Sequence, residues 1–136
     1  MTIYLSGPMS MYGAEQQWGK AIFDAYAKRY RAQGFTVISP LEHDLEILGG
    51  RPFQPGDYGQ CLAADVKLLG SGKVDRIYML PGWQQSRGAR LERLAAQTVG
   101  IPAFDAVTGA ALATQVIVTE VPNSNTMADA IAREDS

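Results

Sequence analysis

The sequence predicts a single α/β domain: a doubly wound, mostly parallel sheet of five strands with helices on both faces. Three observations lead to this expectation. Short β-rich segments alternate with longer segments of helical apolar spacing, and Gly or Pro stands at most of the junctions. The chain has 136 residues, of which 46% are hydrophobic, enough for one compact core. We therefore assign residues 1–136 to one domain.

The first elements follow from local patterns. Residues 2–5 are apolar and end at the turn signal Ser6-Gly7-Pro8, so we expect a strand. Residues 14–33 carry apolar side chains at helical spacing, and Gly34 stands where a helix C-cap belongs. Residues 35–39 are β-rich and are followed by a proline, which predicts the second strand.

The middle of the chain predicts a loop and then a helix. Residues 41–56 contain three Gly and show no sustained period, so we expect a long loop with one helical turn near residues 44–48. Residues 57–69 are expected to be helical and to end at Gly70. The apolar stripe of this helix is predicted at Leu62, Ala63, Val66 and Leu69.

The second half continues the alternation. Residues 75–80 predict a third strand, and residues 101–104 a fourth. Between them, residues 87–99 predict a helix with Ser86 as its N-cap. Its inward positions are predicted to be Leu91, Leu94, Ala95, Thr98 and Val99.

The C-terminal extension, residues 105–136, is expected to add an edge strand at residues 115–121 and a last short helix at 126–134. The sequence contains no internal repeat.

Composition excludes several classes of function. The formal net charge is −2 with no dense Lys/Arg cluster, so a nucleic-acid partner is not expected. One cysteine, Cys61, excludes an intrachain disulfide and a multi-cysteine metal site, and we interpret it as packing. No signal-peptide pattern and no membrane-spanning apolar stretch are present, so we expect a cytoplasmic protein with no membrane partner.

In a parallel sheet with helices on both faces, ligands bind beyond the carboxyl ends of the strands. In this sequence those ends are Ser6-Gly7-Pro8, Ser39-Pro40 and the segment from Leu80 to Trp83. Candidate functional residues are therefore sought near these three segments.

Glu92 lies on the flank of the apolar stripe predicted for residues 87–99. A carboxylate beside apolar surface is partly desolvated, which raises its pKa. The alternative is a first-turn glutamate favoured by the helix dipole and paired with Arg90 or Arg93. Spacing alone favours this alternative.

Asp65 occupies a similar edge position on the preceding helix, where the alternative is a surface aspartate. Two carboxylates directed at one crevice suit nucleophile and acid/base roles at a glycosidic carbon. Tyr4, just before the first turn, is either a core tyrosine or the group that orients such a carboxylate.

Three further residues have two interpretations each. Trp83 either stacks on a base or covers the helix, and Gly88 near a helix N-terminus lets a ligand approach the backbone or binds nothing. His43, in the expected long loop, is interpreted as a loop residue rather than a catalyst.

Several segments together resemble the nucleoside 2-deoxyribosyltransferase-like superfamily, and most closely its small branch known as DUF4406. The segments are Thr2-Ile3-Tyr4-Leu5-Ser6-Gly7-Pro8-Met9-Ser10, Asp65-Val66, Asp75-Arg76-Ile77, Leu80-Pro81-Gly82-Trp83-Gln84-Gln85-Ser86-Arg87-Gly88-Ala89-Arg90-Leu91-Glu92 and Gly100-Ile101-Pro102-Ala103-Phe104. The resemblance covers residues 2–104.

The resemblance implies a flavodoxin-like fold and cleavage of the N-glycosidic bond of 2′-deoxynucleosides or nucleoside 5′-monophosphates. It implies that Glu92 is the nucleophile that attacks C1′, that Asp65 handles the proton of the leaving base, and that Tyr4 positions the nucleophile. It implies no metal or organic cofactor, and a homodimer or larger homo-oligomer. The substrate-binding residues that it implies are Ser6, Gly7, Pro8, Met9, Trp83, Ser86 and Gly88.

Ser86 distinguishes two branches of the superfamily. Related transferases carry an aspartate six residues before the nucleophile, whereas the 5′-monophosphate hydrolases carry a serine there, with glycine two residues later. Ser86 and Gly88 resemble the second pattern, and a serine beside helix N–H groups favours phosphate. The first turn departs from those hydrolases, which have Ser and Arg where this chain has Pro8 and Ser10.

The function expected from the resemblance is hydrolysis of (2′-deoxy)nucleoside 5′-monophosphates through a glycosyl-glutamate intermediate, which releases a free base and a sugar phosphate. One alternative is a deoxyribosyltransferase, in which a second base replaces water. Another is a non-catalytic nucleotide-binding module. Cleavage of NAD-like or cyclic dinucleotides ranks below these because no feature of the sequence is specific to it.

Overall fold

The computed structural model describes residues 1–8, 16–51 and 54–115. Strands and helices alternate as expected, and the strands and helices predicted within the described residues up to residue 104 are confirmed with slightly different bounds. The elements are β1 (Thr2–Ser6), α1 (Gln16–Ala32), β2 (Thr36–Ile38), α2 (Pro40–Ile47), the 3-10 turn η2 (Pro55–Asp57), α3 (Tyr58–Leu69), β3 (Arg76–Met79), the 3-10 turn η3 (Trp83–Gln85), α4 (Arg87–Thr98) and β4 (Ala103–Asp105).

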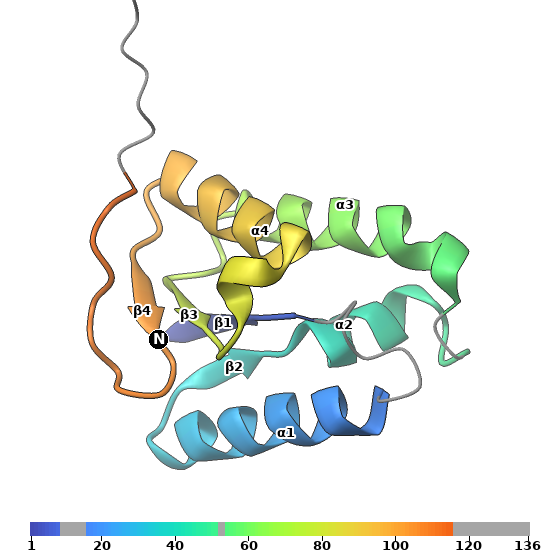
Figure 1. Cartoon of the computed structure of the whole chain (residues 1–136), viewed down its shortest axis with the longest axis horizontal. Helices are drawn as coiled ribbons and strands as arrows, with labels where there is room; N and C mark the ends of the chain where they lie inside the picture. The colour runs from blue at the N-terminus through green and yellow to red at the C-terminus, as the bar shows by residue number, and fades with distance from the viewer. Residues whose placement is uncertain (9–15, 52–53, 116–136) are drawn as a thin grey trace, which may run out of the picture.

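The strands form a four-stranded sheet in the order β2-β1-β3-β4, with every neighbouring pair parallel. Helix α1 covers one face, and α3 and α4 cover the other (Figure 1). The chain passes from β1 to β2 on one side and then to β3 on the other, so the order reverses between β1 and β3. The crevice at such a reversal is where open α/β sheets bind ligands.

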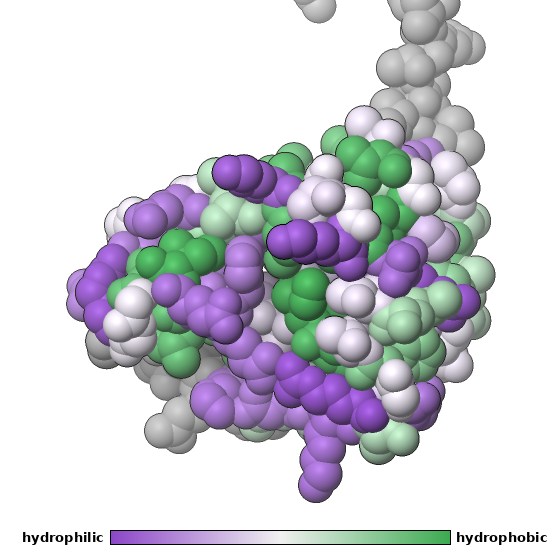
Figure 2. Space-filling model, turned by 180° about the vertical axis from the view of Figure 1, so that it is seen from behind, coloured by the Kyte–Doolittle hydropathy of each residue, from purple (hydrophilic) through white to green (hydrophobic). Residues whose placement is uncertain are grey.

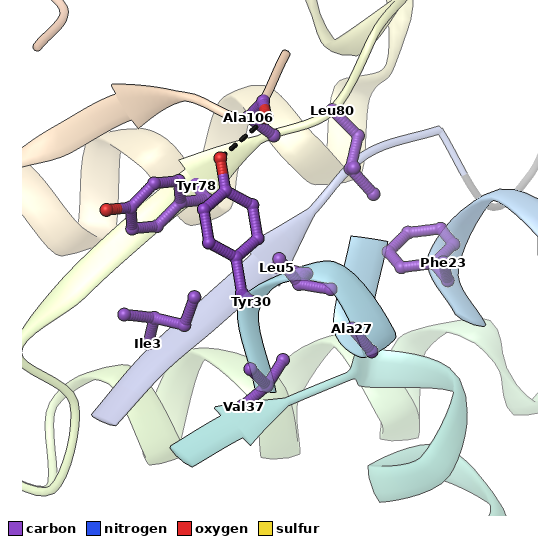
Figure 3. Close-up of a cluster of buried hydrophobic side chains, with 9 residues drawn as sticks. All are labelled: Ile3, Leu5, Phe23, Ala27, Tyr30, Val37, Tyr78, Leu80 and Ala106. Atoms are coloured by element: carbon purple, nitrogen blue, oxygen red, sulfur yellow. Dashed lines mark hydrogen bonds between the residues drawn. The ribbon is translucent and has the colours of Figure 1, made fainter. Parts of the chain in front are cut away.

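Successive side chains of β1 point to opposite faces of the sheet, and the core accordingly consists of two clusters. Ile3 and Leu5 point toward α1, where they pack with Phe23, Ala27 and Tyr30 of that helix (Figure 3). The Tyr30 hydroxyl donates a 2.6 Å hydrogen bond to the carbonyl of Ala106. The second cluster, on the α3–α4 face, contains Tyr4, Leu69, Val74, Ile77, Met79, Trp83, Ala89, Ala96 and Ile101.

The expectation of five strands is corrected, because the sheet has four strands within the described residues. After β4 the chain turns and returns antiparallel, so the backbone N–H of Asp105 donates to Ala110 and that of Leu112 to Ala103. These bonds occupy the outer edge of β4 in the described residues. Gln115 belongs to no strand, and the rest of 115–121, like the helix expected at 126–134, lies outside the described residues.

The long loop expected at residues 41–56 is also corrected, because its first half is helix α2. Ser39 has the extended backbone of an N-cap, and Pro40 occupies the first helical turn, where its fixed φ favours a helix. The helix shows no apolar period because it buries only Pro40 and Asp44. Gly49 and Gly50, with φ of +63° and +84°, end it in a left-handed turn.

The surface is mixed in polarity. Figure 2 shows one face, on which hydrophilic residues surround separate hydrophobic patches. Among the helices of the described residues, none combines the length and the apolar character that a membrane span requires.

Candidate active site

The carboxyl ends of β1 and β3 meet closely at the reversal of strand order. The backbone N–H of Leu80 donates to the carbonyl of Ser6 at 2.8 Å. A Cβ atom added to Gly7 would lie 2.8 Å from the Cβ of Leu80. Only glycine therefore lets the segments that follow β1 and β3 approach each other this closely. Ser6, Gly7 and Pro8 are all buried at this point.

Glu92 of α4 meets two side chains of β1 here. Tyr4 and Ser6 are two residues apart, so they project from the same face of the strand toward α4. The Ser6 hydroxyl donates to Glu92 Oε1 at 3.0 Å, and the Tyr4 hydroxyl donates to Glu92 Oε2. The carboxyl group of Glu92, a residue only 4% exposed, is thus held at both oxygens.

Burial and hydrogen bonding act on Glu92 in opposite directions. Burial raises its pKa, while the bonds from Tyr4 and Ser6 favour the carboxylate and lower it, with a resulting pKa of about 7. The carboxyl group is therefore partly ionised at neutral pH. The same burial, together with the charge of Glu92, raises the pKa of the Tyr4 phenol well above 10, so Tyr4 remains a hydrogen-bond donor.

The buried face of α4 differs from the predicted stripe. Leu91 and Val99 were expected inside but are 44% and 54% exposed. The buried positions are Gly88, Ala89, Glu92, Arg93 and Ala96. Glu92 therefore lies within the buried face rather than on its flank, and the solvated alternative paired with Arg90 or Arg93 is wrong. The apolar periodicity did not predict the buried face of α4 because that face contains two charged residues, Glu92 and Arg93.

Asp65 of α3 is likewise central rather than peripheral. The buried positions of α3 are Cys61, Asp65 and Leu69, so the surface alternative for Asp65 is wrong. Cys61 is buried, as its interpretation as packing predicted. Asp65 Oδ1 lies 2.6 Å from the Nδ1 of His43, which belongs to α2. His43 is thus not a residue of an irregular loop but a partner of a candidate catalytic carboxyl.

Asp44 completes this group and was missed by the sequence reasoning. It is 5% exposed, and one of its carboxylate oxygens lies within 4.8 Å of a carboxylate oxygen of Asp65. The signal that could have found it is the helix start at Ser39-Pro40, which follows a strand end and places His43 and Asp44 one turn later.

The environment of Asp65 favours its protonated form. Burial is the largest cause, followed by the charges of Asp44 and Glu92, and together they raise its pKa to about 10. Burial also raises the pKa of Asp44, but its hydrogen bond with Asp65 and the charge of His43 oppose this. Of the two carboxyl groups, Asp65 is therefore the one that holds the proton more strongly.

His43, Asp44 and Asp65 also have the donor types that bind divalent cations, and one ligand atom of each lies within 4.8 Å of the others. The 2.6 Å contact between His43 and Asp65 accounts for part of this spacing, and the raised pKa of Asp65 indicates a retained proton. We therefore interpret the group as a proton-sharing cluster.

The predicted substrate-binding residues fall into different surroundings. Ser86 is confirmed as the N-cap of α4, with its hydroxyl oxygen accepting from the backbone N–H of Ala89 at 3.2 Å. The space beside Gly88 is occupied by the Tyr58 hydroxyl, which would lie 2.7 Å from an added Cβ. Tyr58, rather than a ligand, approaches the backbone here. Met9 lies outside the described residues.

Trp83 is packed rather than presented to a ligand. It is 9% exposed and belongs to the core cluster of the α3–α4 face. The guanidinium of Arg93 lies over its ring, 4.7 Å from the centroid, and donates to the carbonyl of Ala113. Of the two interpretations, covering of the helix is the one that matches this placement.

The arrangement brings two carboxyl groups with separated pKa values to one edge of the sheet. Glu92 can act as a carboxylate near neutral pH, while Asp65 can supply a proton at the same pH. Such a pair is the usual basis for assigning a nucleophile and an acid.

Comparison with known proteins gives one positive result. A sequence model of one protein family, described as a domain of unknown function (DUF4406), matches residues 1–105. A search of curated proteins found no match to this chain.

Proposed function

The chain belongs to the DUF4406 family, and we propose that it is an N-glycosidase that hydrolyses (2′-deoxy)nucleoside 5′-monophosphates. The observation that carries the proposal is the geometry of Glu92. A buried glutamate whose two oxygens accept bonds from Tyr4 and Ser6 lies on α4, which packs against the helix that carries Asp65, a carboxyl group that keeps its proton at neutral pH. Ligand binding alone requires neither feature.

In the first step of the proposed reaction, a Glu92 oxygen attacks C1′ of the sugar. The C1′–N bond breaks and its electron pair passes to the base, which takes the proton of Asp65. The transition state resembles an oxocarbenium ion, so the adjacent Glu92 carboxylate stabilises its positive charge. The products are a neutral free base, a glycosyl-Glu92 ester and an Asp65 carboxylate.

In the second step, water attacks C1′ and the ester bond to Glu92 breaks. The Asp65 carboxylate takes the proton of the water, so both side chains return to their starting state. The same residue thus acts first as an acid and then as a base, as in retaining glycosidases. Tyr4 and Ser6 restrain the Glu92 carboxylate during both steps.

Ser86 supports a nucleotide rather than a nucleoside as the substrate. Its hydroxyl oxygen accepts a bond from Ala89, so its own O–H can donate to a phosphate at the N-terminus of α4. An aspartate at this position would repel phosphate. The preference therefore depends on Ser86, since Pro8 and Ser10 replace the phosphate contacts of the related hydrolases.

The topology supports the wider relationship that we propose, to the nucleoside 2-deoxyribosyltransferase-like superfamily. The parallel order β2-β1-β3-β4 agrees with the first four strands of a flavodoxin-like sheet. The candidate site lies near the β1–β3 reversal, where flavodoxin-like proteins bind their ligand.

The test is to incubate the purified protein with nucleosides and their 5′-mono-, di- and triphosphates and to separate the products by chromatography. Each reaction runs with and without a second free base, and the Glu92→Gln variant is the control. We expect free base from monophosphates without an added base. Base exchange that requires the second base would instead establish a transferase. Absence of any product with ligand binding retained would overturn the enzymatic proposal in favour of a binding module.

A further inference from the structure

We propose that Asp44 is a positioning residue for Asp65: its buried carboxylate accepts the hydrogen bond that keeps the transferable proton on Asp65, while His43 fixes the orientation of the same carboxyl group. The inference rests on the proposed function, in which Asp65 is the proton donor. It adds a second residue to the acid/base machinery, supplied by a helix of which the sequence predicted a single turn.

The packing of α2 is the first observation. This helix lies at the carboxyl end of β2, beside α3 and β1 (Figure 1). Only Pro40 and Asp44 are buried in it, so Asp44 supplies its one buried polar side chain. A buried carboxylate destabilises a fold unless it is hydrogen-bonded, and a carboxylate oxygen of Asp44 lies within 4.8 Å of ligand atoms of both Asp65 and His43. Asp44 Oδ1 has no hydrogen-bond partner among the described residues.

The carboxyl groups near Asp65 favour this placement of the proton. His43 and Asp44 face it from α2, Tyr4 from β1 and Glu92 from α4. If Asp65 were ionised, its charge would stand next to Asp44 and near Glu92, in a buried setting that screens charge poorly. A proton on Asp65 removes that repulsion and supplies the bond to Asp44. Burial raises the pKa of Asp65 in the same direction.

The arrangement suits both proposed steps. Before the first step, Asp44 adds to the effect of burial in keeping the proton on Asp65. After the proton has passed to the leaving base, two carboxylates stand side by side, and this repulsion makes Asp65 a stronger base toward the attacking water. His43 Nδ1 keeps the carboxyl in place when its charge changes, because an N–H at 2.6 Å can donate to either form.

The experiment compares Asp44→Asn with the wild type. The amide has nearly the shape of the carboxylate but can donate a hydrogen bond, so it stabilises ionised Asp65 instead of opposing it. We expect the pKa of Asp65 to fall by about one unit or more. It is measured without substrate, from the pH titration of the Asp65 carboxyl carbon in ¹³C NMR, with the signal assigned by Asp65→Asn. Glu46→Gln, an exposed charge on the same helix, is the matched control and leaves the titration unchanged.

Activity gives the second readout. The alkaline limb of kcat/KM is expected to move to lower pH in Asp44→Asn and to stay in place in Glu46→Gln and in the conservative variant Asp44→Glu. An Asp65 that titrates near its usual value in the wild type overturns the inference even if Asp44→Asn does not fold. An unchanged titration in Asp44→Asn also overturns it. Failure of the wild type to release base concerns the proposed function alone, because the titration requires no turnover.

Discussion

Glu92 is the residue on which the proposed chemistry depends. Its two hydrogen bonds come from one strand, so its carboxylate is oriented before any substrate binds. Pre-orientation of this kind reduces the rearrangement needed to reach the transition state. The substitution Glu92→Gln keeps the size of the side chain but removes the nucleophile.

For Glu92→Gln we expect base release to fall by about 10³-fold or more while nucleotide binding changes little. Turnover is followed by chromatography and binding by calorimetry. Acid-quenched wild-type reactions should also contain a protein species heavier by the sugar phosphate, detected by mass spectrometry and absent from the variant. Base release at the wild-type rate in Glu92→Gln would remove this residue from the mechanism.

The pKa values of Glu92 and Asp65 predict a bell-shaped pH profile for kcat/KM. Activity should rise as Glu92 ionises at about pH 7 and fall as Asp65 loses its proton at about pH 10. In Tyr4→Phe one bond that favours the Glu92 carboxylate is lost, so the acidic limb should move to higher pH by about one unit.

Tyr30→Phe is the control for that measurement. Its hydroxyl is also hydrogen-bonded, but Tyr30 belongs to the core cluster on the opposite face of the sheet. The variant should lose some stability and keep the wild-type profile. Equal shifts in the two variants would mean that loss of a hydroxyl, rather than its bond to Glu92, moves the limb.

At the scale of elements, the contact between the ends of β1 and β3 positions the site. Gly7 makes that contact possible because an added Cβ would lie 2.8 Å from the Cβ of Leu80. The Leu80 Cβ cannot move unless the backbone at the end of β3 moves with it. We expect Gly7→Ala to lower the free energy of unfolding by about 1–3 kcal/mol, measured by urea denaturation. It should also reduce activity, because Ser6 precedes the displaced residue.

Gly59→Ala is the matched control for this substitution. Gly59 lies in α3, and nothing lies within 4 Å of an added Cβ. Alanine favours a helix more than glycine does, so we expect the free energy of unfolding to rise by about 0.5–1 kcal/mol. A loss of stability in both variants would show that crowding at Leu80 is not the cause.

For the whole molecule, the buried acids predict how stability depends on pH. Between about pH 4 and 10 the folded state holds a proton on Asp65 that the unfolded chain releases, and Glu92 adds a second up to about pH 7. Because the folded state binds more protons, the free energy of unfolding should fall as pH rises, by about 1 kcal/mol per pH unit for each retained proton.

The substitution Asp65→Asn should reduce this slope. Its amide donates to Asp44 and its carbonyl accepts from His43, as the protonated carboxyl does, but it carries no titratable proton. Urea denaturation at pH 5, 7 and 9 should give stabilities similar to the wild type at pH 5 and higher at pH 9. Glu46→Gln should keep the wild-type slope. A wild-type stability that rises over this range would contradict the assignment of the proton to Asp65.

The sequence by itself determined the order of the elements and much of their extent. Strand runs, glycine ends and the Ser86 cap depend on interactions within a few residues, so they can be identified along the chain. It also identified Glu92 and Asp65 as the carboxyl groups of interest, and the roles proposed for them come from the resemblance. The match to residues 1–105 agrees with the DUF4406 part of that resemblance.

Only the tertiary structure decided which helix faces are buried and which residues surround the two carboxyl groups. Apolar periodicity assumes that charged residues face water, so it misplaced Glu92 and Asp65, whose burial depends on partners distant in sequence. Of helix α2 only one turn was predicted, for the same reason, since Asp44 is one of its two buried residues. The tertiary structure likewise shows that the segment containing Ala110 and Leu112 hydrogen-bonds to the outer edge of β4. These features depend on hydrogen bonds between distant residues, which local patterns do not record.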